Sequence, residues 1–395
     1  MVILNWRRNL WALWFGCILS SSSYTMLVPF LPLYLFDLGV TSKTVNLWSG
    51  LIFSISFFVG AVMAPFWGRW ADKAGKRRMV IRAGVSLGTV YFLGSLVRTP
   101  EELFLVRLLQ GFAAGFVPAA MALVSSSAPE DKMGFSLGLM QTATLTGGII
   151  GPLIGGTLAH LFGIRASFQL AAALIFLGTL AVRLLVTEPP CTEPPKCGGV
   201  VDDLKEAWQN QSLVKMLLLL LVVQISAMAL QPLITLYVAE LQGQLEGAML
   251  SSGIVFGLAG IAGAIAAPLW GRLGQEKGFY KILLIGFIGA GVLNVSQFFA
   301  GNIFQFGALQ FAYGLFIAGV FPAINTIVVN STESCFRGRA FGLTMSANQL
   351  GGMIGPLAGG LASSWFGIKI VFVGTGVALL LVGAVLIFKG KQIEG

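Results

Sequence analysis

Long apolar runs separated by short polar breaks dominate this chain. A helix needs about 20 apolar residues to cross a hydrocarbon core of about 30 Å. Barrel strands would instead be short and would alternate between apolar and polar positions. The pattern therefore predicts an all-α membrane protein with twelve transmembrane helices. Their runs lie at 11–35, 47–67, 79–97, 103–123, 136–159 and 167–186, and then at 213–238, 248–270, 281–300, 303–326, 340–362 and 369–388.

The longest polar stretch, residues 187–212, divides these runs into two sets of six. Charge and four prolines between Glu188 and Lys196 make it a semi-rigid linker. We predict an N-terminal six-helix bundle at 1–186, a cytoplasmic linker at 187–212 and a C-terminal six-helix bundle at 213–395.

The amino-acid composition excludes several classes of protein. Of the 395 residues, 56% are hydrophobic and 10% are charged, whereas soluble proteins have about 25% charged residues. This excludes a soluble enzyme, a disordered chain and a nucleic-acid-binding protein, despite the net charge of +9. The first apolar run is longer than the 7–15 residues or so of a signal peptide core, so we expect it to remain in the membrane.

Sequence motifs for metal, nucleotide or covalent chemistry are missing. The chain has a single histidine, His160, and four scattered cysteines, so we expect no metal site. It has no P-loop, so ATP is not expected to drive it. Without HExxH, GxSxG or a carboxylate pair within a run, we predict that it is not an enzyme and needs no cofactor.

Lysine and arginine are distributed unevenly between the loops. If the N-terminus is cytoplasmic, twenty of the 25 basic residues, Arg82 among them, fall on the inner side. Four basic residues fall outside, namely Lys43, Arg98, Arg165 and Lys369, and Arg107 lies within a run. Cytoplasmic loops carry the excess of positive charge. Both termini are therefore predicted to be cytoplasmic, and the net charge requires no acidic partner.

The two halves repeat one another at an offset of 203–204 residues. Ala64-Pro-Phe-Trp-Gly-Arg69 matches Ala267-Pro-Leu-Trp-Gly-Arg272. Parallel six-helix repeats are typical of secondary transporters whose substrate site lies between the halves. Small residues allow close helix packing, so we predict that the fifth and eleventh runs, 136–159 and 340–362, each pack against a helix of the other half. The repeated small residues are Gly138, Gly147, Gly151, Pro152, Gly155 and Gly156, which match Gly342, Gly351, Gly355, Pro356, Gly359 and Gly360.

Four motifs resemble those of the major facilitator superfamily, and specifically its twelve-helix drug:proton exporters. They are Pro29–Gly39, Gly68–Arg78, Arg107–Gly111 and the glycine pattern Gly138–Gly156. The resemblance covers essentially the whole chain. It implies a bacterial inner-membrane exporter of amphiphilic drugs, driven by the proton gradient and working as a monomer. The alternative is a proton-linked transporter of one metabolite or of a (lyso)lipid.

The loop motif is expected to act as a cytoplasmic latch. Asp72 can sit at the N-terminus of the eleventh predicted helix, run 340–362, where the helix dipole favours negative charge. The basic residues that follow can pair with Glu130 or Asp131. The alternative is an unlatched loop whose charges only set topology. The latch residues are Gly68, Asp72, Gly75, Lys76, Arg77 and Arg78.

Proton coupling is assigned to three charged residues. Arg107 is the one basic residue deep within a run, its counterpart at offset 204 is Phe311, and the resemblance implies a coupling role. No acidic residue falls clearly at mid-membrane, so Asp37 and Glu240 at the outer helix ends are the candidate proton carriers. The alternatives are a structural arginine and solvated helix-end carboxylates.

Aromatic, methionine and amide side chains on the helices that line the cavity in this family are the candidate substrate contacts. Such groups suit an apolar ligand with a few polar atoms. Because the chain has 30 phenylalanines, most of them are expected to face lipid or core. The candidates are Tyr24, Phe112, Phe116, Met140, Gln141, Gln224, Gln231, Phe316, Asn325, Met345 and Asn348.

Overall fold

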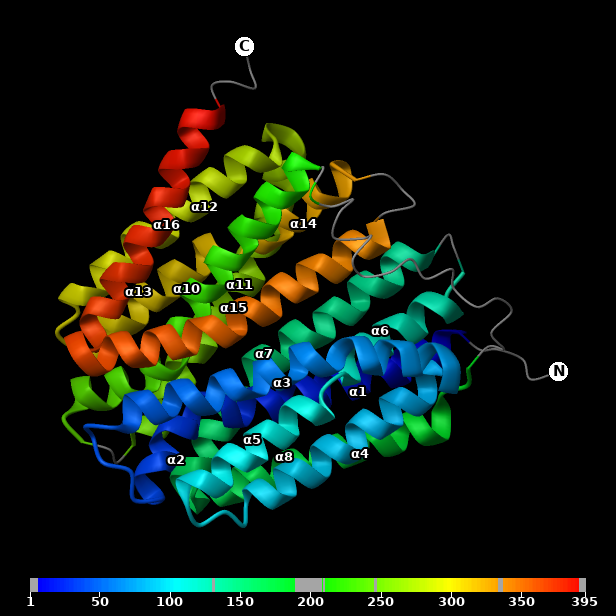
Figure 1. The fold of residues 1–395 in the computed structure, drawn as a ribbon, viewed down its shortest axis with the longest axis horizontal. Coiled ribbons are helices and arrows are strands. Elements are labelled where there is room, and N and C mark those ends of the chain that lie inside the picture. The colour runs from blue at the N-terminus through cyan, green and yellow to red at the C-terminus, as the bar shows by residue number, and fades with distance from the viewer. Residues whose placement is uncertain are drawn as a thin grey trace. The chain divides into compact units, whose positions relative to one another are not determined.

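The computed structural model describes residues 6–129, 132–188, 208, 210–244, 247–332 and 337–390. Over these ranges the secondary structure is helical and contains no strand. The first half comprises α1 (Trp6–Leu27), η1 (Val28–Phe30), α2 (Leu31–Asp37), α3 (Val45–Ala74), α4 (Lys76–Gly94), α5 (Pro100–Ala113), α6 (Phe116–Ser127), α7 (Met133–Phe162) and α8 (Ile164–Leu185). The second half comprises α10 (Gln211–Gln242), α11 (Ala248–Lys277), α12 (Phe279–Ser296), η3 (Gln297–Phe299), α13 (Ile303–Ile317), α14 (Val320–Asn330), α15 (Arg337–Phe366) and α16 (Ile368–Gly390) (Figure 1).

Ten segments of the described chain are long and apolar enough to cross a membrane. They confirm the predicted all-α, multi-pass class. Two further long helices, α4 and α15, do not meet the same criteria. Lys76, Arg77 and Arg78 open α4 with Arg82 one turn later, and α15 is rich in glycine and in polar residues such as Asn348.

Side-chain caps and prolines set several helix boundaries. Thr99 accepts a hydrogen bond from the backbone N–H of Glu102 at 3.3 Å, and Pro100 follows as the first residue of α5. Asn302 caps α13 in the same way by accepting from the N–H of Gln305 at 2.9 Å. Such caps satisfy N–H groups that have no partner within the helix. The duplicated halves thus start their fourth helices with the same device.

The chain divides into two compact units. The first comprises Met1–Val40, Ile55–Lys196 and Met249–Ile254, and the second comprises Thr41–Ser54, Cys197–Ala248 and Val255–Gly395. In the first unit α1 packs against α7 and α8, and α4 lies along α8. In the second unit α10 packs against α15, and α12 lies along α16.

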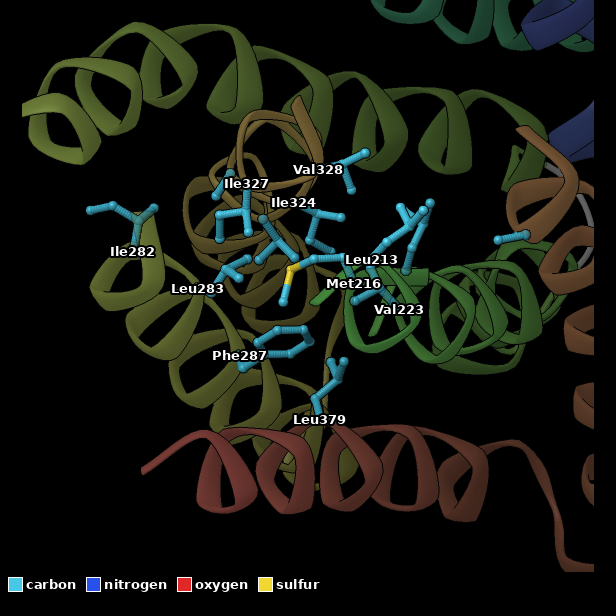
Figure 2. Close-up of a cluster of buried hydrophobic side chains, with 14 of the residues drawn as sticks. Leu213, Met216, Val223, Ile282, Leu283, Phe287, Ile324, Ile327, Val328 and Leu379 are labelled. Carbon is cyan, nitrogen blue, oxygen red and sulfur yellow. The ribbon is translucent and has the colours of Figure 1, made fainter. Parts of the chain in front are cut away.

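The core of the second unit is built from aliphatic side chains around one phenylalanine (Figure 2). Leu213, Met216 and Val223 of α10 meet Phe287 of α12 and Leu379 of α16. The contact between these helices is therefore apolar around Phe287.

The repeated glycines pack mainly within their own half. A Cβ atom added at Gly151 would lie 2.7 Å from the Ser22 carbonyl oxygen of α1, and one added at Gly355 would lie 2.7 Å from that of Ile225 on α10. Gly147 and Gly155 also face α1, and Gly351 and Gly359 also face α10. The prediction of packing against the other half was therefore wrong for these six glycines. Residues spaced by four share one face of a helix, and that face is turned towards the first helix of the same half.

Gly156 and Gly360 lie on the neighbouring face and do approach a helix of the other half. A Cβ at Gly156 would lie 2.7 Å from the carbonyl oxygen of Met249 in α11, within the first unit. A Cβ at Gly360 would lie 2.6 Å from that of Asn46 in α3, within the second unit. The predicted packing is confirmed at these two positions. Gly138 has open space around it, and the side-chain position of Gly342 lies outside the described part of the chain.

Candidate functional site

Arg107 lies at the centre of a buried polar cluster in the first unit. Its side chain is 2% exposed. One guanidinium nitrogen donates to the side-chain oxygen of Gln110, one turn further along α5. The Tyr24 side chain of α1 lies beside the guanidinium and interacts with it electrostatically. The amide nitrogen of Gln110 in turn donates to the Tyr91 hydroxyl of α4 at 3.4 Å. Three helices thus converge on one intramembrane cation.

Backbone contacts hold α5 in place beside this cluster. The Ser56 hydroxyl of α3 donates to the Arg107 carbonyl oxygen at 2.8 Å. A Cβ at Gly111 would lie 2.8 Å from the Cβ of Val59, so a glycine is needed for α5 to lie this close to α3. Charge buried in a membrane is expensive and is usually retained for function. Gln110 and Tyr91 were not among the predicted residues, although Gln110 lies three positions after Arg107, where a helix brings side chains together.

The second half carries a neutral counterpart of this cluster. Two equivalent bonds establish the offset. Trp67 donates to the Phe112 carbonyl oxygen at 2.9 Å, and Trp270 donates to that of Leu315 at 2.6 Å. Both pairs are related by 203 residues, so the counterpart of Arg107 is Gln310 and not Phe311. The offset of 204 applies only further along the chain, where the glycine pattern lies.

Gln310 begins a chain of buried amide and hydroxyl groups. It donates to the Gln297 side-chain oxygen at 3.0 Å, and Gln297 donates to that of Asn294 at 3.3 Å. Asn294 donates to the Thr375 hydroxyl at 3.3 Å. Buried polar groups that satisfy one another stabilise a specific packing. The two halves therefore use equivalent places differently, with a cation in the first and neutral groups in the second.

The predicted latch loop is held by a carboxylate that sequence reasoning missed. Glu188 accepts from the backbone N–H of Lys76 at 2.6 Å and from that of Arg77 at 3.1 Å. A carboxylate at the start of α4 satisfies free N–H groups and complements the helix dipole. Just before it, Gly75 has φ +99° and a Cβ there would lie 2.7 Å from a Glu188 oxygen. Two features of the sequence could have indicated this contact. Glu188 closely follows the sixth predicted run, 167–186, and Gly75 belongs to the loop motif Gly68–Arg78.

The other latch residues have different surroundings. The Arg77 side chain donates to the Arg183 carbonyl oxygen at 2.6 Å. Arg78 is exposed, and a Cβ at Gly68 would have open space. The side chain of Asp72 and the whole of Glu130 and Asp131 lie outside the described part of the chain, so these pairings remain predictions.

The two candidate proton carriers are exposed at helix ends. Asp37 is the last residue of α2, and Glu240 lies near the end of α10. Neither carboxylate is buried in the way that Arg107 is. Their placement favours the alternative given for them, solvated helix-end charges.

The predicted substrate contacts lie in different environments. Phe116 and Met140 are fully buried, and the Phe116 ring lies against Gly16 and Gly84 in the core of the first unit. Phe316 packs on Trp270 with a centroid distance of 6.2 Å. Phe112, Gln141 and Met345 are exposed, whereas Tyr24, Gln224, Gln231, Asn325 and Asn348 are half-buried. Of the set, Tyr24 is the one joined to the Arg107 cluster by a described contact.

The described residues hold no group of three or more His, Cys, Asp or Glu side chains placed to bind a metal ion. Cys17 is buried and free.

Comparisons with known proteins agree with this architecture. The family model of the Major Facilitator Superfamily matches residues 13–278 and 216–393. The chain is 34% identical over 379 residues to the multidrug resistance protein MdtG of Klebsiella pneumoniae, covering 95% of this chain and 92% of the relative. It is 32% identical over 370 residues to MdtG of Proteus mirabilis, covering 93% and 92% of the two chains.

Solved structures share the fold at low sequence identity. The nucleoside transporter NupG matches with a TM-score of 0.82 and 14% identity, over 96% of this chain and 99% of that one. A bacterial homologue of the human lysosomal transporter Spinster matches with a TM-score of 0.81 and 16% identity, over 98% and 97%.

Proposed function

This chain belongs to the major facilitator superfamily, and we propose that it is a secondary active transporter that exports amphiphilic drugs or related small molecules in exchange for protons. The observation that carries the export proposal is the likeness to multidrug resistance proteins over 95% of the chain. The duplicated architecture suits alternating access, in which two repeats move about a site between them.

Arg107 supports the coupling part of the proposal. It is a buried cation that donates to Gln110 and lies beside Tyr24, and the second half has neutral groups in the equivalent place. A charge confined to one half gives that half a response to nearby protonation that the other half lacks. We assign coupling to the first unit, with Arg107 as its central residue.

The membrane arrangement that we propose has twelve spans, with α4 and α15 crossing in addition to the ten apolar segments. Both termini are then cytoplasmic, as the positive-inside rule requires. The protein acts as a monomer in a bacterial inner membrane, where the proton gradient supplies the energy and no other cofactor is needed.

Purified protein in proteoliposomes tests export and coupling together. With an imposed pH gradient, we expect a fluorescent amphiphilic drug to move against the proton flow, and a proton-selective ionophore to abolish that movement. A resistance panel in a host that lacks its own pumps measures the substrate range. Protection against one compound only would favour the alternative, a transporter of a single metabolite or (lyso)lipid. Unchanged transport after the gradient is collapsed would contradict proton exchange.

A further inference from the structure

The fourth helix of the first half is broken, and the break has a specific structure. α5 ends at Ala113 and α6 begins at Phe116. Between them Ala114 has φ −56° and ψ 162°, and Gly115 has φ +119° in the left-handed region. Glycine adopts that conformation without steric cost, unlike other residues. The last carbonyl groups of α5 therefore lack their usual partners within the helix.

Arg82 of α4 supplies those partners. One guanidinium nitrogen donates to the Phe112 carbonyl oxygen at 3.3 Å, and the other terminal nitrogen donates to that of Ala114 at 3.3 Å. The C-terminal end of a helix carries partial negative charge, so a cation there is stabilising. The sequence places Arg82 among the cytoplasmic basic residues, and in the structure it lies on α4, where it also caps a neighbouring helix.

Trp67 completes the arrangement. The guanidinium carbon of Arg82 lies 3.8 Å from the Trp67 ring centroid, within the range of a cation–π contact. The indole N–H of Trp67 donates to the same Phe112 carbonyl oxygen at 2.9 Å. The Trp67 and Phe112 rings also pack edge to face, with their centroids 5.0 Å apart. We call Trp67, Arg82, Phe112 and Ala114 the Arg82 clamp.

The second half shows what the junction looks like without the cation. Trp270 keeps the indole bond to Leu315, but Ile285 stands where Arg82 would repeat. There the junction between α13 and α14 stays close to helical, with Ala318 at φ −60°, ψ −26° and Gly319 at φ −80°, ψ −22°. In the second half, the tryptophan bond is present without the cation, and the helix is nearly continuous. In the first half, the cation is present and the helix is fully broken.

We propose that Arg82 is a positioning residue that holds the α5–α6 break and so fixes α5, with Arg107 and Gln110, independently of α6. With the end of α5 capped from α4, the half-helix that carries Phe116 can change its angle without displacing the buried cation. The helix break stands on the geometry alone, and its part in transport rests on the proposed function.

Hydrogen exchange of the full-length protein in lipid nanodiscs tests the clamp directly. In Arg82→Met, amides in 108–118 are expected to exchange about tenfold faster, because the cation that stabilises the carbonyl end of α5 is lost. Arg82→Lys, which keeps the charge but not the two-nitrogen contact, should give intermediate protection. The matched control, Ile285→Met, should leave residues 311–321 unchanged. Equal exchange in wild-type and Arg82→Met protein would overturn the clamp.

Transport by the same variants tests the positioning role. Arg82→Met should lower the maximal export rate about tenfold while KM changes less than about twofold, since no substrate contact is removed. Arg82→Lys should again be intermediate. Faster exchange with an unchanged export rate would overturn the positioning role. If the wild-type protein exports no tested compound, the proposed function fails while the exchange result still decides the clamp.

A milder variant covers the case in which Arg82→Met does not accumulate in the membrane. Trp67→Phe keeps an aromatic face but removes the indole N–H bond to Phe112. Intermediate exchange and intermediate maximal rate would support the clamp. Wild-type values of both would contradict it.

Discussion

At the scale of single residues, the repeat provides an internal comparison for Arg107. Gln310 occupies the equivalent place in the second half, buried and hydrogen-bonded to Gln297. The equivalent place in the second half is therefore filled by a neutral side chain. This contrast is the basis for the coupling role that we propose for Arg107.

Replacing Arg107 by glutamine tests this reading. We expect Arg107→Gln to accumulate in the membrane at wild-type levels, because the second half tolerates that side chain. Transport driven by a pH gradient should fall by about tenfold or more, since the only charge of the cluster is lost. Uptake into proteoliposomes measures the rate. Gln310→Met is the control that should lose stability but keep coupling, and full pH-driven transport by Arg107→Gln would contradict the assignment.

Gly75 and Gly278, which occupy equivalent places in the two halves, allow the contribution of the Glu188 cap to stability to be measured. Both have positive φ, +99° and +87°, but only the Cβ position of Gly75 faces Glu188, while that of Gly278 is open. An alanine in the left-handed region costs about 1–2 kcal/mol. Gly75→Ala should cost about 1–3 kcal/mol more than Gly278→Ala, because it also displaces the carboxylate from two N–H groups. Thermal unfolding in detergent compares them, and equal losses would show that the Glu188 cap adds no stability.

At the scale of helices, the faces of α7 that carry glycine determine which neighbouring helices can approach its backbone closely. Gly147, Gly151 and Gly155 bring α7 against α1, and Gly156 turns the adjacent face of α7 towards Met249 of α11. One helix thus makes close backbone contacts on two sides. The sequence pattern predicted close packing correctly, but not the partner, because spacing alone does not say which neighbour a face meets.

Gly151→Ala and Gly148→Ala separate this packing from helix propensity. A Cβ at Gly151 would lie 3.0 Å from the backbone nitrogen of Met26, whereas nothing lies within 4 Å of one at Gly148. Overpacking costs about 1–3 kcal/mol, while Gly to Ala at an open helical site stabilises by about 0.5–1 kcal/mol. We expect opposite shifts of the unfolding temperature. Equal shifts would mean that α1 and α7 adjust freely.

At the scale of the whole molecule, the sequence predicts the class and the duplication better than the site. Apolar run length and the repeat lead directly to the helical membrane fold, since both follow from bilayer thickness and chain order. The partners of Arg107 could not be deduced in the same way. Tyr24, Tyr91 and Gln110 come from three helices, and only packing reveals which of their faces meet. The same holds for Glu188, whose role depends on a turn far away in sequence.

Topology is the whole-molecule prediction that remains to be measured. In a background without native cysteines, Lys43→Cys should react with a membrane-impermeant maleimide in intact cells. Lys277→Cys should react only after the membrane is opened, because the positive-inside rule places it in the cytoplasm. Both positions are exposed in the structure, so access to the side chain is not limiting. Labelling of both from the same side would rule out the proposed arrangement.

The segment between the two halves is fastened at both ends. Thr187 exchanges two hydrogen bonds with Asn9, at 2.6 and 3.0 Å, directly before the Glu188 cap. On the far side Asn210 caps α10 and donates to the Ser331 carbonyl oxygen at 2.7 Å. A cut or an inserted tag placed between these two anchor points leaves each half with its own fastening intact. We therefore expect two separately expressed fragments, 1–188 and 189–395, to reassemble, since each keeps one of these sets of hydrogen bonds.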